Sequence, residues 1–361
     1  MKILYLNGGA TPIKDLAIEK LTKLDHDIIF YDPTITKSET FRWSTKHFQM
    51  YENVLNRAED LNVDLLYFST SVSMPEYLLF ELRSRPRFKP DIIFHLMLRG
   101  LNRSMSRCIA LKELIDMPQI RRVVANVMII NEIAVPKNMI EAGIDFRKFL
   151  LINESFNPQS EDLDCFGVSK ESARKHFGIP ENAFVALQSG TWAHIKGVDL
   201  FVDSLNNLTE DITPIIHKHP YGEDPLLEKN LLERAKLNHS KTIIIDRWLS
   251  PMEYPALFRA ADVVVCAHRL SYEYGESGIP GVACKAKRPI IVPNFYFFNE
   301  IIHRHEVGYC YEPENAFSMA TMIKELKQNY SHIINNARFD DAIKNYGTDI
   351  SDIPVKALVG L

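Results

Sequence analysis

Short, uninterrupted apolar runs recur along the chain and alternate with amphipathic stretches. Runs that are apolar throughout, rather than at every second position, are typical of strands buried on both faces of a sheet. Their spacing leaves room for a crossover helix between consecutive strands. One such helix is visible directly, because Val198, Phe201, Leu205 and Leu208 follow the three-and-four spacing of a buried stripe. The pattern therefore predicts an α/β protein built on parallel sheets. The expected strands are Ile3–Leu6, Ile28–Tyr31, Leu65–Phe68, Ile92–Phe94, Val123–Ala125, Phe149–Ile152, Phe184–Leu187, Ile215–Ile216, Ile243–Ile245, Val263–Cys266 and Ile290–Val292.

A polar segment divides these strands into two series. The stretch from Asn153 to Pro158 is followed by QSEDLD. It is polar and contains a proline, which is typical of a domain junction. The length of 361 residues also favours two domains, since single cores stop growing at roughly 250–300 residues. We expect a first α/β lobe over residues 1–158 and a second over 159–340. A tail over 341–361 is a candidate to cross back to the first lobe.

The composition is that of a globular protein and excludes several classes. With 42 Lys and Arg against 46 Asp and Glu, the net charge is −4, so a surface covered throughout by nucleic-acid contacts is excluded. The five cysteines are odd in number, widely spaced and form no C-x-x-C pair, which favours reduced thiols over a disulfide framework or structural zinc. The first apolar run is too brief for a signal peptide, and no stretch approaches the roughly 18 apolar residues of a membrane span. We therefore expect a cytoplasmic protein.

The segments that follow the strands hold the candidate chemistry, because parallel sheets place ligand loops at the carboxyl ends of their strands. In Ser189–Gly197, Gly190 permits a sharp exit from the strand, and Lys196 stands at the start of the next helix, where a phosphate is favoured. A solvated lysine in an ordinary loop is the alternative. Asn7-Gly8-Gly9 would let the backbone approach a ligand, but it is equally a common way to end a strand.

A further loop, Tyr272–Pro280, precedes a predicted helix. Proline suits a first helical turn, so the amides of Ser277 and Gly278 are expected at the amino end of that helix, where they would face an anion. Glu276 or Glu273 is a candidate to accept hydrogen bonds from sugar hydroxyls. The alternative is a turn capped by Ser277 with solvent-exposed acids.

Several segments of the second half, taken together in this order, resemble a known family. They are SGTWAHIKGVDLF, ALFRAADVVV, the acidic glycine-containing loop YEYGESGIP, KRPIIV and EVGYCYEPEN. The second half resembles the donor-binding lobe of the GT-B-fold glycosyltransferases grouped as family four. The resemblance covers roughly residues 120–330, and residues 1–119 fit only in general shape.

The resemblance implies a GT-B fold, in which two Rossmann-like lobes with parallel sheets face a cleft between them. It implies a hexosyltransferase-like enzyme that moves a sugar from a nucleotide-diphosphate sugar to an acceptor with retained anomeric configuration. A UDP-sugar is the expected donor, and no cofactor or metal is expected. The donor-binding residues carried over by the resemblance are Gly8, Gly9, Gly190, Lys196, Glu276, Ser277 and Gly278.

One departure from the family pattern concerns charge at the diphosphate. Thr191 occupies the place of the arginine that usually follows the loop glycine, which removes one of two expected cations. Arg247 and Arg269 each come soon after a predicted strand and are candidates to restore that charge, since a guanidinium binds phosphate through two hydrogen bonds. Either is equally a candidate surface residue.

A second departure concerns the family's Glu-x7-Glu signature, which is degenerate here. Glu276 is the better candidate for the first glutamate, and we assign it and Lys196 to catalysis. The eighth residue after Glu276 is Cys284, and the eighth after Glu273 is Gly281. The second glutamate, which in the family holds ribose hydroxyls, is therefore absent.

Histidines suggest an alternative donor and argue against a metal site. His219-Pro220 follows a strand and resembles the phosphate-contacting pair of GT-B enzymes that use CMP-sugars or CDP-glycerol. The pairs His217/His219 and His303/His305 place histidines two residues apart, but neither has a third ligand nearby in sequence, so metal binding is not expected. No pair of carboxylates stands at a spacing that favours a hydrolase.

The acceptor side is marked by local charge. Between Glu81 and Arg122 there are ten Lys and Arg against four acids. This excess, in residues 83–122, would attract an anionic acceptor, a membrane surface or nucleic acid, although a solvated face spread over several elements is the alternative. His95 and Arg99 follow a predicted strand and are acceptor-side candidates, and His95 is also a catalytic candidate.

Two other functions stay open on the sequence alone. The missing glutamate and arginine are compatible with a non-catalytic GT-B protein that acts as partner or chaperone of an active transferase. A nucleotide-sugar epimerase of the same architecture is the second.

Overall fold

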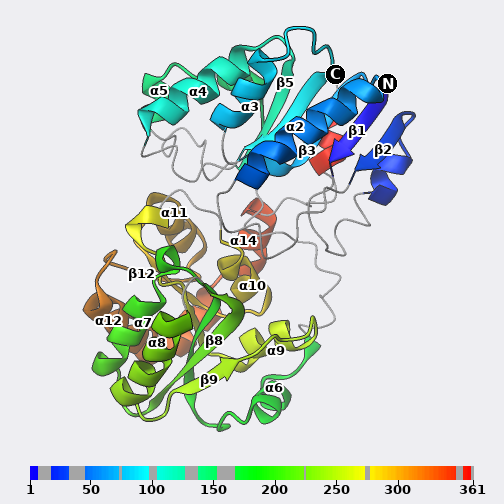
Figure 1. The fold of residues 1–361 in the computed structure, drawn as a ribbon. Coiled ribbons are helices and arrows are strands. Elements are labelled where there is room, and N and C mark those ends of the chain that lie inside the picture. The colour runs from blue at the N-terminus through cyan, green and yellow to red at the C-terminus, as the bar shows by residue number, and fades with distance from the viewer. Residues whose placement is uncertain are drawn as a thin grey trace. The chain divides into compact units, whose positions relative to one another are not determined.

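The chain forms two compact units in the computed structural model, which describes residues 1–6, 18–31, 45–72, 75–96, 104–126, 137–152, 167–222, 225–272, 277–346 and 353–358 (Figure 1). Unit 1 comprises Met1–Ile152 together with Thr348–Leu361, and unit 2 comprises Asn153–Gly347. The sequence predicted domain boundaries after residues 158 and 340, whereas the two units of the structure divide after residues 152 and 347.

Unit 1 is built on a sheet of six parallel strands in the order β2-β1-β3-β4-β5-β6. The elements are β1 (Lys2–Leu6), β2 (Asp27–Tyr31), α2 (Thr45–Asp60), β3 (Leu65–Val72), α3 (Pro75–Arg83), β4 (Asp91–Leu96), α4 (Met105–Asp116), β5 (Ile120–Asn126), α5 (Lys137–Glu141), the 3-10 turn η3 (Phe146–Lys148), β6 (Phe149–Ile152) and α15 (Ile353–Leu358).

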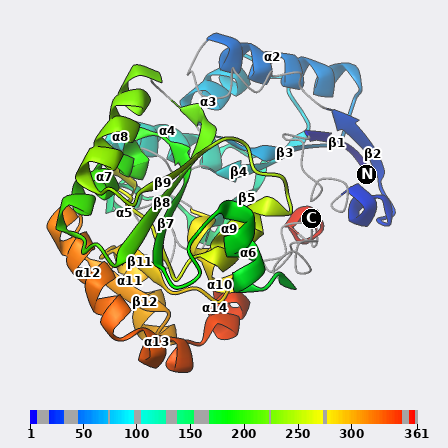
Figure 2. The same cartoon turned by 90° about the horizontal axis from the view of Figure 1, so that it is seen from below.

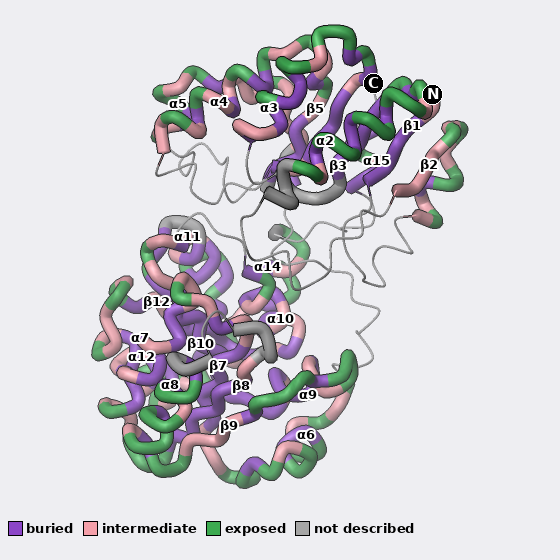
Figure 3. The backbone as a smooth tube through the Cα atoms, viewed as in Figure 1, coloured by how far each residue is buried: buried purple, intermediate pink, exposed green. Residues whose placement is uncertain are grey.

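Both faces of the sheet of unit 1 are covered. On one face, buried strand residues such as Tyr5, Tyr67 and Val124 pack with Ile353 and Leu358 of α15, so the carboxyl-terminal helix completes this core (Figure 3). On the other face, Tyr51 of α2 meets the ring of Phe68 of β3 edge-on with centroids 6.0 Å apart. Burial on both faces explains why these strands are apolar throughout.

Unit 2 has a second sheet of six parallel strands in the order β12-β11-β10-β7-β8-β9. Its elements are α6 (Lys170–Phe177), β7 (Phe184–Trp192), η5 (His194–Lys196), α7 (Val198–Ser204), η6 (Leu205–Asn207), β8 (Ile212–Gly222), α8 (Pro225–Asn238), β9 (Ile243–Asp246), α9 (Glu253–Ala260), β10 (Val263–Val265), η7 (Leu270–Tyr272), α10 (Ile279–Lys285), β11 (Ile290–Pro293), α11 (Tyr296–His305), β12 (Gly308–Tyr311), α12 (Ala316–Gln328), α13 (Tyr330–Asn336) and α14 (Phe339–Tyr346).

Helices cover both faces of this second sheet. Side chains of α7, α8 and α12, such as Phe201, Ala235 and Ile323, pack on the strand residues of one face. Figure 2 shows these three helices on one side of the strands and α6, α9 and α10 on the other. The α/β class with parallel sheets, predicted from the apolar runs, is confirmed.

Two details differ from the prediction. The stripe from Val198 to Leu208 is not one helix, because α7 ends at Ser204 and continues as the 3-10 turn η6, after which Leu208 is extended. The strand β12 was missed, because its sequence GYCY lacks the run of aliphatic residues that marked the others.

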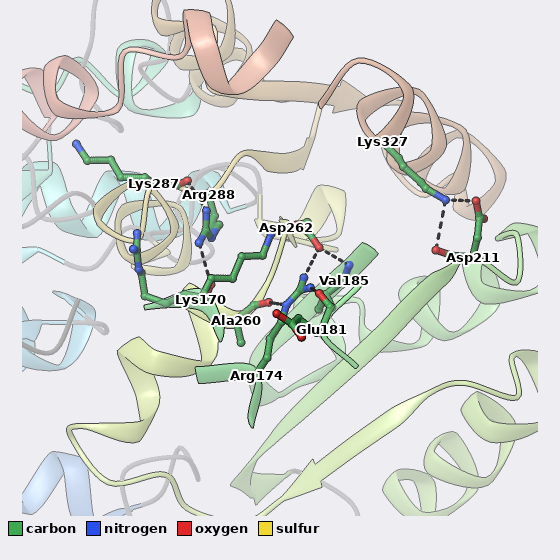
Figure 4. A network of polar contacts seen from close by, with 11 residues as sticks. Lys170, Arg174, Glu181, Val185, Asp211, Ala260, Asp262, Lys287, Arg288 and Lys327 are labelled. Atoms are coloured by element: carbon green, nitrogen blue, oxygen red, sulfur yellow. Dashed lines mark hydrogen bonds and ion pairs between the residues drawn. The ribbon is translucent and has the colours of Figure 1, made fainter. Parts of the chain in front are cut away.

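A buried ionic cluster joins the amino ends of β7 and β10 (Figure 4). One carboxylate oxygen of Asp262, just before β10, accepts hydrogen bonds from the guanidinium of Arg174 and from the amide of Val185, both at 2.7 Å. Its other oxygen pairs with the ammonium of Lys170. Removing one partner of such a buried pair costs about 3–5 kcal/mol, because the other charge is left without compensation. This cluster therefore fixes α6 to the sheet at the end where parallel sheets do not bind ligands.

None of the helices described in either unit combines the length and the apolarity that crossing a lipid bilayer requires.

Candidate functional site

The strand order places β7 at the point of unit 2 where the chain changes direction. β7 pairs with β8 on one side and with β10 on the other, although β10 follows it only after β8 and β9. In open parallel sheets, ligands bind in the crevice beyond the carboxyl ends of the two strands that flank such a switch point. The segments after β7 and β10 are therefore the candidates, and they contact each other through η5 and η7. Figure 3 shows the two strands close together in unit 2.

The two segments approach each other closely at a glycine. Gly197 has a φ of 60°, and a Cβ atom there would lie 1.9 Å from the carbonyl oxygen of Ala267. The amide of Arg269 donates to the carbonyl of Ile195 at 3.1 Å, and its guanidinium Nε donates to the carbonyl of His194 at 3.1 Å. The loop after β7 is thus held against the loop after β10 by backbone contacts that no side chain at residue 197 would permit.

Lys196 lies at this junction and contacts two rings from the β10 loop. Its Nζ donates to the hydroxyl of Tyr272 at 2.7 Å and lies 3.9 Å from the centroid of the same ring. Nζ is also 3.5 Å from Nε2 of His268. We call Lys196, His268 and Tyr272 the Lys196 cluster.

The imidazole of His268 is buried and neutral within this cluster. It stacks on Tyr272 with centroids 4.6 Å apart and planes 15° apart, and on Phe298 at 6.1 Å. Burial, reinforced by the charge of Lys196, lowers the pKa of His268 well below its usual 6.5. Of the three members of the cluster, the ammonium of Lys196 therefore carries the positive charge, and two aromatic rings from one loop hold it in position.

The arginines that the sequence offered as phosphate ligands are bound to carboxylates. The guanidinium of Arg269 pairs with Asp199 and Glu314. Arg247 pairs with Glu253, whose two oxygens lie 2.5 and 3.2 Å from it, and this contact holds the pKa of the Glu253 carboxyl far below its usual range. These contacts differ from the predicted role: Arg269 joins the loops of the site, and Arg247 ties the end of β9 to the start of α9.

The loop glycine of the prediction lies inside a strand. Gly190 and Thr191 belong to β7, which continues to Trp192 instead of ending at Leu187. The pairing of β7 with β8 is interrupted between Gly190 and Trp192, and Gly190 has a φ of 130°, which side chains rarely adopt. The glycine therefore permits an irregularity near the end of β7 and not an exit into the loop.

Ser277 and Gly278 precede α10 as predicted, but the serine does not cap the helix. Gly278 occupies the N-cap position, Pro280 lies in the first turn, and the helix receives no side-chain cap. Ser277 is 4% exposed, and its hydroxyl has no hydrogen-bond partner among the atoms that the structure describes. Cys284, which stands eight residues after Glu276, is buried in α10.

Of the remaining candidates, the structure describes the side chain of His95 alone. Gly8, Gly9, Arg99 and Glu276 lie outside the described residues, and His219 is placed in β8 without a described side chain. His95 belongs to unit 1, at the carboxyl end of β4, where its Nε2 lies 2.8 Å from the hydroxyl of Tyr67. Burial lowers the pKa of His95 to about 4, so this predicted catalytic residue is neutral at physiological pH.

Sequence reasoning missed His268 and Tyr272. Both follow the predicted strand Val263–Cys266, in the segment from which Arg269 and residues of the loop Tyr272–Pro280 were chosen instead. Their place after a strand was the available signal. Across the described stretches, His, Cys, Asp and Glu side chains form no group of three that could hold a metal ion.

Comparison with known proteins relates this architecture to a family. Residues 169–345 match the model of the family described as Glycosyl transferases group 1, and this stretch lies within unit 2. The match covers most of unit 2 and none of unit 1. Among proteins of curated function, none matches the sequence.

Solved structures resemble the whole chain at low sequence identity. Anabaena Alr3699/HepE in complex with UDP-glucose has a TM-score of 0.70 at 17% identity, with 100% of both chains covered. Sucrose-phosphate synthase from Thermosynechococcus elongatus has a TM-score of 0.68 at 13% identity over 99% of this chain and 98% of its own. A glycosyltransferase from Rickettsia africae has a TM-score of 0.62 at 14% identity over 100% and 99%. The chain therefore has the GT-B fold, as the resemblance implied.

Proposed function

We propose that this chain is a glycosyltransferase that moves a sugar from a nucleoside-diphosphate sugar, with a UDP-sugar as donor, to an acceptor, and that Lys196 binds the donor diphosphate. The observation that carries the proposal is the place of the Lys196 cluster, beside the switch point of β7 and β10 in the stretch that matches the group 1 family model. The complexes of Anabaena HepE with UDP and with UDP-glucose support the choice of uridine.

The proposed chemistry follows from where charge develops. As the glycosidic bond breaks, negative charge accumulates on the leaving nucleoside diphosphate, and a fixed cation whose attraction grows at that moment lowers the barrier. Lys196 is fixed before substrate arrives, because Tyr272 contacts its Nζ through the hydroxyl and through the ring. Transfer is proposed to retain the anomeric configuration and to need no metal ion. The acceptor is unassigned, and His95 and Arg99 stay predictions for its binding.

The proposal is tested by donor binding to a pair of lysine variants. Lys196→Ala removes the ammonium from the cluster, whereas Lys236→Ala removes an exposed lysine on α8. Charged hydrogen bonds contribute about 1.5–3 kcal/mol, so we expect the Kd for UDP, measured by calorimetry, to rise about 10-fold or more in Lys196→Ala and to stay unchanged in Lys236→Ala. Equal affinity of the two variants would show that Lys196 does not bind the diphosphate.

The reaction itself distinguishes the alternatives. Incubation with UDP-, GDP-, TDP-, ADP- and CMP-sugars should give slow donor hydrolysis with at least one of them, and EDTA should leave the rate unchanged. Binding of UDP without turnover would support a non-catalytic partner of another transferase. Conversion of the donor sugar without an acceptor, followed by NMR, would support an epimerase.

A further inference from the structure

A basic pocket lies in unit 1 at the amino ends of β5 and β6. Its volume is about 350 Å³, and its titratable lining consists of Arg121, Arg122, Arg147, Lys148 and Lys356. Two apolar residues at the start of β6, Phe149 and Leu150, complete the lining. The site is therefore contributed by three segments, namely the start of β5, the turn into β6 and the carboxyl-terminal helix α15.

Two of the five cations are oriented by backbone carbonyls. Arg122 donates to the carbonyl oxygens of Lys356 and Ala357 in α15 at 3.2 and 2.7 Å. Lys148 donates to the carbonyl of Ile115 at 2.6 Å and to that of Met117 at 3.4 Å. These bonds fix the direction of the two side chains, and the carbonyl oxygens that accept them carry no formal charge.

Carboxylates balance only part of the remaining charge. Asp91 lies 2.8 Å from Arg121, and Asp145 lies 2.6 Å from Arg147. In the ranges that the structure describes, neither Lys148 nor Lys356 forms an ion pair. Like charges that lie within a Debye length of about 8 Å repel one another. An anion in the pocket would convert this repulsion into attraction.

The pocket is separate from the Lys196 cluster. It belongs to unit 1, and Lys196 belongs to unit 2. Arg121 and Arg122 are the second and third residues of β5, and Phe149 and Leu150 are the first two of β6. The pocket thus lies at the opposite end of its sheet from the loops that follow strands, where ligands of the proposed reaction are expected.

We propose that the basic pocket binds a phosphate group. Guanidinium groups match phosphate through paired hydrogen bonds, and Lys148 and Lys356 add two ammonium charges. The volume falls at the small end of the range for ligand pockets, about 300–1,000 Å³, and suits one phosphorylated head group. A phosphate bound there bridges β5 and α15, so it stabilises the packing of α15 against the sheet of unit 1. The phosphate comes either from a soluble phosphorylated molecule or from the head group of an anionic lipid.

The test uses the full chain in a Lys196→Ala background, so that binding at the proposed donor site does not contribute. Inorganic pyrophosphate is the soluble probe, and calorimetry gives its Kd. Lys356→Glu and Arg147→Gln remove lining charges at exposed positions, and Lys137→Glu changes an exposed lysine of α5 in the same unit. We expect pyrophosphate to bind about 10-fold or more weakly to the two pocket variants, with the Lys137→Glu affinity unchanged.

Vesicles distinguish the two sources of phosphate. Cosedimentation with vesicles of phosphatidylcholine and phosphatidylglycerol, but not of phosphatidylcholine alone, that is lost in Lys356→Glu would assign the pocket to a lipid head group. Pyrophosphate binding without cosedimentation would assign it to a soluble ligand. Binding of pyrophosphate that is equal in Lys356→Glu and Lys137→Glu, or no binding at all, would overturn the proposal. Neither result bears on donor binding at Lys196.

Discussion

The candidate donor site depends on how one lysine side chain is held. A lysine gives up as much as about 2 kcal/mol of rotamer freedom when it is fixed, and a ligand that has to fix it loses that amount from its affinity. In this chain Tyr272 contacts Nζ through both its hydroxyl and its ring, and His268 supports the ring from behind. The ammonium is thus ordered by folding before any anion binds.

This arrangement predicts a specific effect of removing one oxygen atom. Tyr272→Phe deletes the hydroxyl that accepts from Lys196 but keeps the ring that stacks on His268. A hydrogen bond to a charged group contributes about 1.5–3 kcal/mol, of which the cation–π contact retains a part, so we expect the Kd for UDP to rise about 3- to 10-fold. Calorimetry checks the affinity, and thermal unfolding checks the fold.

The matched control is Tyr309→Phe, a partly buried tyrosine in β12 that packs against the core of unit 2. It should leave UDP binding unchanged. An equal loss of affinity in both variants would mean that the effect of Tyr272→Phe is not specific to the Lys196 cluster.

At the scale of elements, the sequence predicted the sheets well because burial on both faces leaves a simple pattern. Eleven apolar runs correspond to eleven of the twelve strands in the residues that the structure describes. The strand β12 escaped because Gly308, Tyr309 and Cys310 do not form an aliphatic run. The end of α7 escaped because a 3-10 turn continues the same buried stripe with a different hydrogen-bond pattern.

The candidate site was only partly predictable, for a different reason. Lys196 could be found because its loop follows a strand and resembles a family motif. Its partners are 72 and 76 residues away in sequence, and they meet it only because β7 pairs with β10. The ion pairs that occupy Arg247 and Arg269 leave no local pattern, so both residues looked available for a ligand.

The close contact between Gly197 and Ala267 predicts the effect of adding a methyl group at residue 197. Gly197→Ala places Cβ 1.9 Å from the carbonyl oxygen of Ala267 in a left-handed conformation. Strain of the backbone alone costs about 1 kcal/mol, and the clash with backbone atoms adds to it, so we expect a loss of about 2–4 kcal/mol of unfolding free energy. Denaturant titration measures this loss.

Gly178→Ala is the matched control for this experiment. Gly178 ends α6 with a φ of 65°, but a Cβ there would meet nothing within 4 Å. This variant should lose only the backbone component, about 1 kcal/mol. If the two variants were equally stable, the close approach of the two loops would be refuted.

At the scale of the whole molecule, the chain is organised as one interrupted and one continuous unit. Unit 2 is a single stretch of sequence, whereas unit 1 is assembled from both ends of the chain. The returning helix α15 contributes Ile353, Ala357 and Leu358 to the same buried cluster as β1, β3 and β4. Its six residues are too few to form a stable helix alone, so α15 depends on this packing.

Ala357→Asp should therefore weaken unit 1 selectively. Ala357 is 0% exposed, and an unpaired carboxylate at this position would be removed from water without compensation, which costs several kcal/mol. Hydrogen exchange should show faster exchange in β1, β3 and β4, with β7, β8 and β10 unchanged. Lys356→Ala, on the exposed side of the same helix, is the control and should leave both sets of strands protected. Equal exchange in the two variants would show that α15 does not support the sheet.

Unit 1 combines two segments that are separated in sequence by unit 2, so its parts are synthesised at different times. A ribosome makes the six strands of the first sheet early, but it adds the helix that covers part of one face only after all of unit 2. During that interval Tyr5, Tyr67 and Ile93 lack the apolar side chains of α15 that pack against them in the folded unit. A nascent chain of this protein thus exposes apolar side chains of the first sheet until α15 has been synthesised, and chaperones have a defined surface and period in which to act.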